Sequence, residues 1–273
     1  AATGKGPSRP AMKFLGNGIS IKYELFGPEG APTVVVSHSL ASSLIMWAPQ
    51  LPPLALKFQV LCYDTRGHGG TAAPAGKYTL DMLGDDAMAL MDGLGLHKVH
   101  WVGLSMGGMI GQNIALREAG RFNSLTLCDT AAHMPPDGRA SWDERIGIVS
   151  EQGMEPLADP TMERWFTAGY LAGKPSSVDA IRKQFLATAP AGYMGCCHAL
   201  KTLDYLEQLP GIITPTMIIV GAEDMGTPVS ASEAMQARIP NAQLVVLEEA
   251  AHLSNIEQAE GFNAAMMGFL NAQ

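Results

Sequence analysis

Residues 99–108 read Val-His-Trp-Val-Gly-Leu-Ser-Met-Gly-Gly: an apolar run, 99–102, is followed directly by a Gly-x-Ser-x-Gly pattern. A stretch with helical apolar spacing, 108–119, comes next. A tight turn from strand to helix would lift the Ser105 hydroxyl out of a sheet, and Gly103 and Gly107 leave room for that turn. The pattern therefore predicts a nucleophilic serine. The alternative is a glycine-rich turn in which Ser105 only caps the helix.

A serine hydroxyl needs a base to take its proton and a carboxylate to orient that base, and both follow later in the chain. Asp224 comes after the apolar run 217–220, and His252 comes after the run 244–247. The carboxyl ends of parallel strands meet at one sheet edge, so Ser105, Asp224 and His252 are the predicted catalytic residues. Glu223 is the alternative acid.

Short apolar runs that do not alternate are typical of strands buried on both faces of a parallel sheet. Stretches with helical spacing separate these runs, so an α/β fold is expected. A hairpin with an Asn17-Gly18 turn precedes them. The predicted strands are 33–36, 60–63, 99–102, 125–128, 217–220 and 244–247, and the predicted helices are 80–94, 108–119, 230–238 and 255–270.

The segment between the fourth and fifth of these runs has no convincing strand but several helix-like stretches. We interpret residues 132–209 as a helical cap inserted into a core made of residues 12–131 and 210–273. Residues 1–11 are small, polar and rich in Gly and Pro, and we interpret them as a vector-derived tail.

Composition excludes several classes of function. Of the 273 residues, 47% are hydrophobic and 16% are charged, and the formal net charge is −8. A chain with this excess of acidic residues is not expected to present a basic surface that binds phosphate groups, so neither nucleic acid nor an anionic membrane is an expected partner. The four cysteines lack the spacing of a zinc site or a disulfide framework, and we expect a reduced, cytoplasmic protein.

The oxyanion of an acyl-transfer reaction needs two backbone donors. The predicted donors are the amides of Met106, after the serine, and Leu40, in the loop after the first parallel strand. No metal site is expected, because no His-Glu-x-x-His or His-x-x-x-His spacing occurs and Asp81, Asp85 and Asp86 read as the solvated face of a helix. A phosphate-binding glycine loop is also missing from the sequence.

Six segments together resemble the bacterial 3-oxoadipate enol-lactonases of the α/β-hydrolase superfamily. They are Ser37-His38-Ser39-Leu40, Met46-Trp47-Ala48-Pro49-Gln50, Tyr63-Asp64-Thr65-Arg66-Gly67-His68-Gly69, Gly103-Leu104-Ser105-Met106-Gly107-Gly108, Arg164-Trp165-Phe166-Thr167 and His252-Leu253-Ser254-Asn255-Ile256-Glu257. The resemblance implies a mostly parallel eight-stranded sheet flanked by helices, with an inserted cap. It also implies hydrolysis of a small lactone through an acyl-serine, without cofactor or metal.

The chain departs from this family where His133 follows Asp129-Thr130-Ala131-Ala132, because family members often carry a basic residue there. Ala41 and Ala251 also replace usual glycines. A carboxylate on the substrate would need a cation, and His133, Arg139, Arg145 and Arg164 are the candidates. The predicted pocket residues are Trp47, Met106, His133, Met134, Trp142, Arg164, Trp165 and Met225.

Two other functions remain open. One is a general carboxylesterase or a cofactor-free perhydrolase of the same fold, which only the substrate would distinguish. The other is a ligand-sensing protein that keeps the fold for binding. The expected partner is a small lactone or ester, and the sequence leaves the oligomeric state open.

Overall fold

The computed structural model describes residues 12–273, so the predicted tail lies outside the described residues. An eight-stranded sheet in the order β1-β2-β4-β3-β5-β6-β7-β8 forms its centre. The strands β3 to β8 pair in parallel, whereas the hairpin β1–β2 is antiparallel, as predicted. The strands are β1 (Met12–Gly16), β2 (Ile19–Phe26), β3 (Thr33–Ser37), β4 (Gln59–Tyr63), β5 (Val99–Leu104), β6 (Phe122–Cys128), β7 (Thr216–Gly221) and β8 (Gln243–Leu247).

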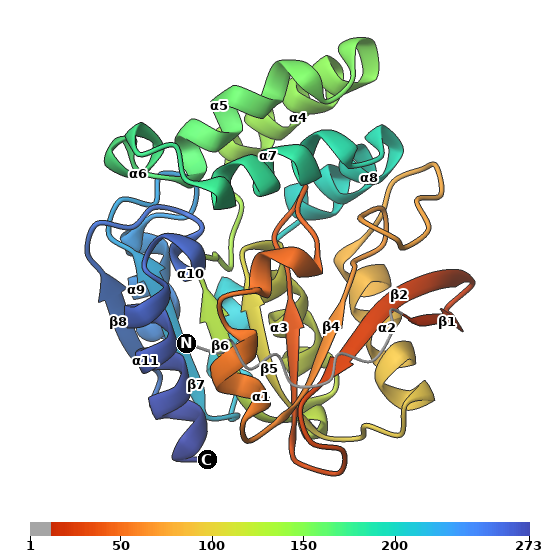
Figure 1. Cartoon of the computed structure of the whole chain (residues 1–273). Helices are drawn as coiled ribbons and strands as arrows, with labels where there is room; N and C mark the ends of the chain where they lie inside the picture. Colours follow the sequence, from red (N-terminus) through yellow and green to blue (C-terminus); the bar gives the residue numbers. More distant parts are fainter. Residues whose placement is uncertain (1–11) are drawn as a thin grey trace.

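Helices cover both faces of this sheet (Figure 1). Helices α2 and α3 pack on each other and on one face, while α1 and α11 pack on each other and on the opposite face. The core helices are α1 (Leu51–Ala55), α2 (Leu80–Gly93), α3 (Met106–Arg117), α9 (Val229–Gln236), α10 (Ser254–Glu257) and α11 (Ala259–Asn271). Short 3-10 helices are η1 (Leu44–Trp47), η2 (Ala119–Arg121) and η3 (Leu206–Gly211). The predicted α/β fold is thus confirmed.

Five consecutive helices separate β6 from β7 and lie across the end of the sheet, above the tips of the parallel strands (Figure 1). They are α4 (Pro136–Gln152), α5 (Glu155–Trp165), α6 (Ala168–Ala172), α7 (Ser176–Ala187) and α8 (Pro190–Lys201). This arrangement confirms a helical insertion. Between residues 12 and 273, none of the helices combines the length and the apolar character needed to cross a bilayer.

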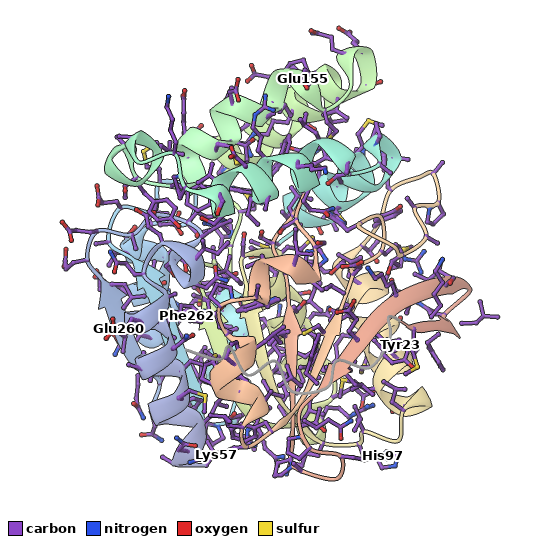
Figure 2. The ribbon with its side chains drawn as sticks, viewed as in Figure 1. Tyr23, Lys57, His97, Glu155, Glu260 and Phe262 are labelled. Atoms are coloured by element: carbon purple, nitrogen blue, oxygen red, sulfur yellow. The ribbon has the colours of Figure 1, made fainter. Side chains whose placement is uncertain are left out.

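The core lies between the sheet and its helices. Figure 2 shows Phe262 of α11 on the inside, whereas charged side chains such as Lys57 and Glu155 lie at the periphery. All four cysteines are free and buried, as expected for small apolar side chains in a core. Burial raises the pKa of the Cys62 thiol and that of the Cys128 thiol well above the ordinary value of a cysteine. Both thiols therefore stay protonated and unreactive.

Two sequence predictions were wrong in detail. Asp86 is not on the solvated face of α2: it is buried and forms a bidentate ion pair with Arg66, at 2.7 and 2.8 Å. The predicted helix 255–270 is two helices, because the backbone of Gln258 leaves the helical region at φ −123° and ψ 54°. The resulting bend lets α10 lie beside η1 while α11 covers the sheet.

Candidate active site

Ser105 lies in the turn between β5 and α3, with backbone angles of φ 54° and ψ −114°. The left-handed φ is strained for a residue with a side chain, and hydrogen bonds hold it. Its amide donates to the carbonyl of Cys128 at 2.8 Å, and its carbonyl accepts from Thr130 Oγ1 at 2.7 Å. The turn is so tight that a Cβ on Gly103 would lie 2.2 Å from the Gly107 carbonyl oxygen. This is the geometry that the Gly-x-Ser-x-Gly pattern predicts.

His252 and Asp224 form a buried hydrogen-bonded pair, with 2.8 Å between His252 Nδ1 and Asp224 Oδ2. Asp224 also accepts from the amides of Gly226 and Thr227, both at 3.0 Å, and from the Thr227 hydroxyl at 2.9 Å. Burial alone would raise the pKa of Asp224, but the attraction and hydrogen bond of His252 lower it below its ordinary value. Asp224 is therefore an anion that orients the imidazole. The alternative acid, Glu223, is exposed.

Ser105 and His252 both line a cavity of about 280 Å³ between the sheet and the cap. Leu40 lines the same cavity. Met106 is the first residue of α3, so its amide is one of the first-turn donors that have no acceptor within the helix. Of the two predicted donors, Leu40 therefore lies in the loop after β3 and Met106 at the start of α3, directly after Ser105.

Two neutral histidines hold the loop that carries Leu40. His38 Nδ1 lies 2.7 Å from the Ser39 carbonyl, and its Nε2 accepts from the Thr65 amide. His68 Nε2 accepts from the amide of Ala41 at 2.8 Å. Burial lowers the pKa of His38 to about 4 and that of His68 to about 3, so both stay uncharged acceptors. Ala41, which replaces a usual glycine, adopts φ 59° and needs this support.

The cap contributes an aromatic and cationic wall. Trp165 lies beside the imidazole, with ring centroids 6.4 Å apart. Arg145 stacks over the Trp142 ring at 4.4 Å, and Arg164 Nη2 donates to Thr161 Oγ1 at 3.3 Å. Within residues 12–273, neither guanidinium has a carboxylate at ion-pair distance. The cavity therefore carries two positive charges without a counter-charge.

The structure brings most of the predicted pocket residues together. The lining includes Met134, Trp142, Arg164, Trp165 and Met225, and Met225 is 71% exposed. Three predicted residues do not line the cavity. Trp47 is fully buried against Phe262 in the core, and His133 lies beside Asp204, with 3.3 Å between its Nδ1 and Asp204 Oδ1. Met106 is also buried rather than among the lining side chains.

Hydrogen bonds connect the cap to the segment that carries His252. The Leu253 amide donates to the Trp165 carbonyl at 3.1 Å, and Glu257 accepts from both the amide and the hydroxyl of Thr167. Glu257 also accepts from the Ala251 amide. The two segments Arg164–Thr167 and His252–Glu257 are therefore one structural unit that sets the cap over the imidazole.

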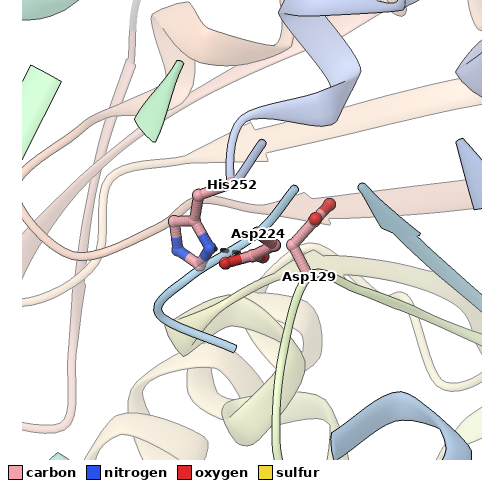
Figure 3. A group of neighbouring side chains, drawn as sticks. All are labelled: Asp129, Asp224 and His252. Atoms are coloured by element: carbon pink, nitrogen blue, oxygen red, sulfur yellow. Dashed lines mark hydrogen bonds and ion pairs between the residues drawn. The ribbon is translucent and has the colours of Figure 1, made fainter. Parts of the chain in front are cut away.

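Sequence reasoning missed Asp129, which follows β6 and lies beside Asp224 and His252 (Figure 3). One ligand atom from each of the three side chains lies within 4.8 Å of the others. Each carboxyl is already engaged, because Asp129 accepts from the Gly221 amide and from Ser254 Oγ, while Asp224 accepts from Thr227 and His252. These contacts favour a hydrogen-bonded cluster over a cation site.

Comparison with known proteins places this geometry in a family. The family model described as the alpha/beta hydrolase fold matches residues 32–259. The chain is 38% identical to 3-oxoadipate enol-lactonase 2 of Acinetobacter baylyi, over 91% of this chain and 92% of the relative. The enol-lactonase of Burkholderia xenovorans LB400 has a TM-score of 0.92 at 38% identity and covers 95% of this chain and 100% of its own.

A more distant solved structure shares the whole architecture. The malate-bound thermophilic esterase of Thermogutta terrifontis has a TM-score of 0.90 at 28% identity, and the match covers 97% of this chain and 99% of that chain. The strand–turn–helix around Ser105, the sheet order and these matches agree, and the chain belongs to the α/β-hydrolase family.

Proposed function

We propose that this hydrolase opens a small lactone that carries a carboxylate, through an acyl-serine intermediate, as a 3-oxoadipate enol-lactonase does. The observation that carries the proposal is the single cavity that joins Ser105 and His252 to Arg145 and Arg164. A nucleophile and base at one wall suit the ester bond. Two unpaired guanidiniums at the other wall suit a carboxylate.

In the proposed mechanism, Ser105 Oγ attacks the lactone carbonyl while His252 takes the hydroxyl proton. Asp224 stabilises the imidazolium through Nδ1, and the amides of Leu40 and Met106 donate to the oxyanion. The tetrahedral intermediate then breaks the ring C–O bond, and His252 returns the proton to the leaving oxygen. Because the substrate is cyclic, this oxygen stays attached to the acyl group.

Hydrolysis of the acyl-enzyme follows the same path in reverse. His252 takes a proton from water, and the resulting hydroxide attacks the acyl carbonyl in the same oxyanion site. The ester bond to Ser105 breaks, His252 returns the proton to Oγ, and the product leaves as a free acid. Every step uses groups of this chain and water, so the proposed reaction uses no cofactor or metal.

The electrostatics of the cap support an anionic substrate. Burial and the nearby charge of Arg145 lower the pKa of Arg164. A carboxylate bound between the two guanidiniums would replace the lost water and offset their repulsion. The relatives named enol-lactonase support the lactone, and the malate in the esterase structure is an organic carboxylate.

The proposal is tested by comparing kcat/KM for 3-oxoadipate enol-lactone with kcat/KM for an uncharged short-chain aryl ester. We expect the lactone to be preferred by at least about 100-fold, from two charge-assisted contacts. Preference for the neutral ester would contradict the proposal and identify a general carboxylesterase. Slow single turnover of every ester, with a large ligand-induced shift in unfolding temperature, would identify a ligand sensor.

The proposed substrate is a free small molecule of aromatic catabolism, and we also propose a cytoplasmic location. Four buried, unpaired cysteines support a reducing compartment. Oxidation-sensitive labelling in intact cells, with all four thiols found reduced, is the corresponding test.

A further inference from the structure

The cavity that holds Ser105 and His252 meets solvent at the loop after β7. Among the described residues that line this cavity, Met225 and Gly226 are the two exposed ones, and the others are buried or half-buried. Met225 is a large apolar side chain with 71% of its surface exposed, and the proposed mechanism does not use it. The mouth of the cavity therefore lies beside Met225.

A second, outer pocket of about 440 Å³ adjoins this mouth. Arg164 and Met225 line both the inner cavity and the outer pocket. Arg164 Nη2 donates to Thr161 Oγ1, and Thr161 lines the inner cavity but not the outer pocket, so this contact holds the guanidinium on the inner side. Met225 is then the side chain that separates the two spaces.

The backbone around Met225 is fixed, whereas its side chain is adaptable. Asp224 Oδ1 accepts from the amides of Gly226 and Thr227, both at 3.0 Å, so the loop is hydrogen-bonded on both sides of Met225. A methionine side chain is unbranched and rotates about three bonds. The width of the passage between the inner cavity and the outer pocket therefore depends on this one side chain.

The lining of the outer pocket suits an uncharged alkyl chain. Phe166 and Ala251 are buried and Ala222 is half-buried, so these three residues form an apolar inner wall that favours methylene groups. Glu163 and Glu223 are exposed at the edge of the pocket. Their carboxylates disfavour a second anion there.

The alcohol part of an ester is the part that extends toward this pocket. The leaving oxygen must lie beside His252, because the imidazole returns the proton to it. Ala251, which precedes His252, lines the outer pocket, and Met225 follows Asp224, the hydrogen-bond partner of His252. A chain attached to the leaving oxygen therefore extends past His252 toward Met225, while the acyl group is bonded to Ser105.

We propose that Met225 is a specificity-determining residue that limits the length of the alcohol chain of the substrate. Its side chain closes the passage from the inner cavity of about 280 Å³ to the outer pocket, which would otherwise take an uncharged alkyl chain. The proposal rests on the proposed function, because it assigns the leaving-group side of the reaction at Ser105. Small lactones and short esters fit the inner cavity, and longer alkyl esters are excluded at Met225.

The test compares kcat/KM for acetate esters from ethyl acetate to hexyl acetate, measured by acid release at constant pH. All these esters give the same acetyl-enzyme, so the differences come from the alcohol part. Met225→Ala should raise the ratio of hexyl to ethyl acetate at least about tenfold, because each buried methylene contributes about fourfold and two or more would enter the outer pocket. Met225→Leu, with a side chain of similar volume, should keep the wild-type ratio.

The controls separate the alcohol side from the rest of the enzyme. Ile213→Ala removes an apolar side chain that is 80% exposed and lines neither space, so it should keep the ratio within about twofold. A second series, from ethyl acetate to ethyl hexanoate, varies the acyl chain, and Met225→Ala should change that ratio by less than about threefold. An unchanged alcohol-chain ratio in Met225→Ala overturns the proposal, and so does a shift at least as large in the acyl series.

A second measurement needs no turnover. Titration calorimetry with 1-hexanol, the alcohol that hexyl acetate would release, should show that Met225→Ala binds it at least about tenfold more tightly than the wild type does. Equal affinities overturn the proposal even if no acetate ester is hydrolysed. Because this result does not depend on Ser105 as a nucleophile, failure of the proposed function is distinguishable from failure of this inference.

Discussion

Substituting Arg145 or Arg164 of the cap is the most informative perturbation, because neither guanidinium has a carboxylate partner among the described residues. Arg164→Gln keeps a long side chain with hydrogen-bond donors and removes only the charge. A charge-assisted hydrogen bond contributes about 1.5–3 kcal/mol, so kcat/KM for the anionic lactone is expected to fall by about 10- to 150-fold. Arg145, which lines the same cavity, is expected to give a comparable loss as Arg145→Gln.

The control for this experiment lies on α4, the helix that carries Arg145. Arg139 is exposed and does not line the cavity, so Arg139→Gln leaves both activities unchanged. A neutral aryl ester supplies the second control: Arg164→Gln changes its kcat/KM by less than about threefold, since no carboxylate is present. Equal losses on both substrates would refute the charge argument, and so would an Arg164→Gln enzyme that still prefers the lactone to the same extent.

Two further predictions concern stability. In the folded protein, burial lowers the pKa of His38 to about 4 and that of His68 to about 3, whereas a histidine of the unfolded chain has a pKa near 6.5. Between these values the unfolded chain binds more protons than the folded protein. The free energy of unfolding therefore falls as the pH drops from about 6.5 to 4. Urea unfolding at several pH values measures this slope of the unfolding free energy against pH. His68→Gln should reduce the slope by up to roughly 1.4 kcal/mol per pH unit. A slope unchanged by the substitution would contradict the burial of His68 in its neutral form. Gly103→Ala places a Cβ 2.2 Å from the Gly107 carbonyl oxygen and is expected to lower stability by about 3 kcal/mol or more. A thermal melt equal to that of the wild type would show that the turn is not as tight as described.

The parts of the fold that follow from local pattern were predictable. The strand–turn–helix at Ser105 combines a buried run, two glycines and a helical period within a short segment, and each feature is visible in the sequence. The order of Asp224 and His252 after two later strands is equally local, because residues after parallel strands share one sheet edge. These two features place the catalytic candidates in one region.

Features that depend on distant partners were not predictable. Asp86 reads as solvated on its own helix and is buried only because Arg66 reaches it from another loop. Trp47 was expected to line the pocket, but it is the last residue of η1 and packs against Phe262 of α11. Asp129 carries no motif, and only its contacts with Gly221 and Ser254 reveal it.

The central claim is that Ser105 forms the covalent intermediate, and intact-protein mass spectrometry of rapidly quenched reactions tests it most directly. A lactone should add its full mass to the wild type, because the leaving oxygen stays attached, whereas an aryl ester should add only its acyl part. The added mass should map to the peptide that contains Ser105, and Ser105→Ala should show none and lose at least about 10³-fold in kcat. A Ser105→Ala enzyme that retains activity within about tenfold of the wild type, or an adduct on another residue, would contradict the account.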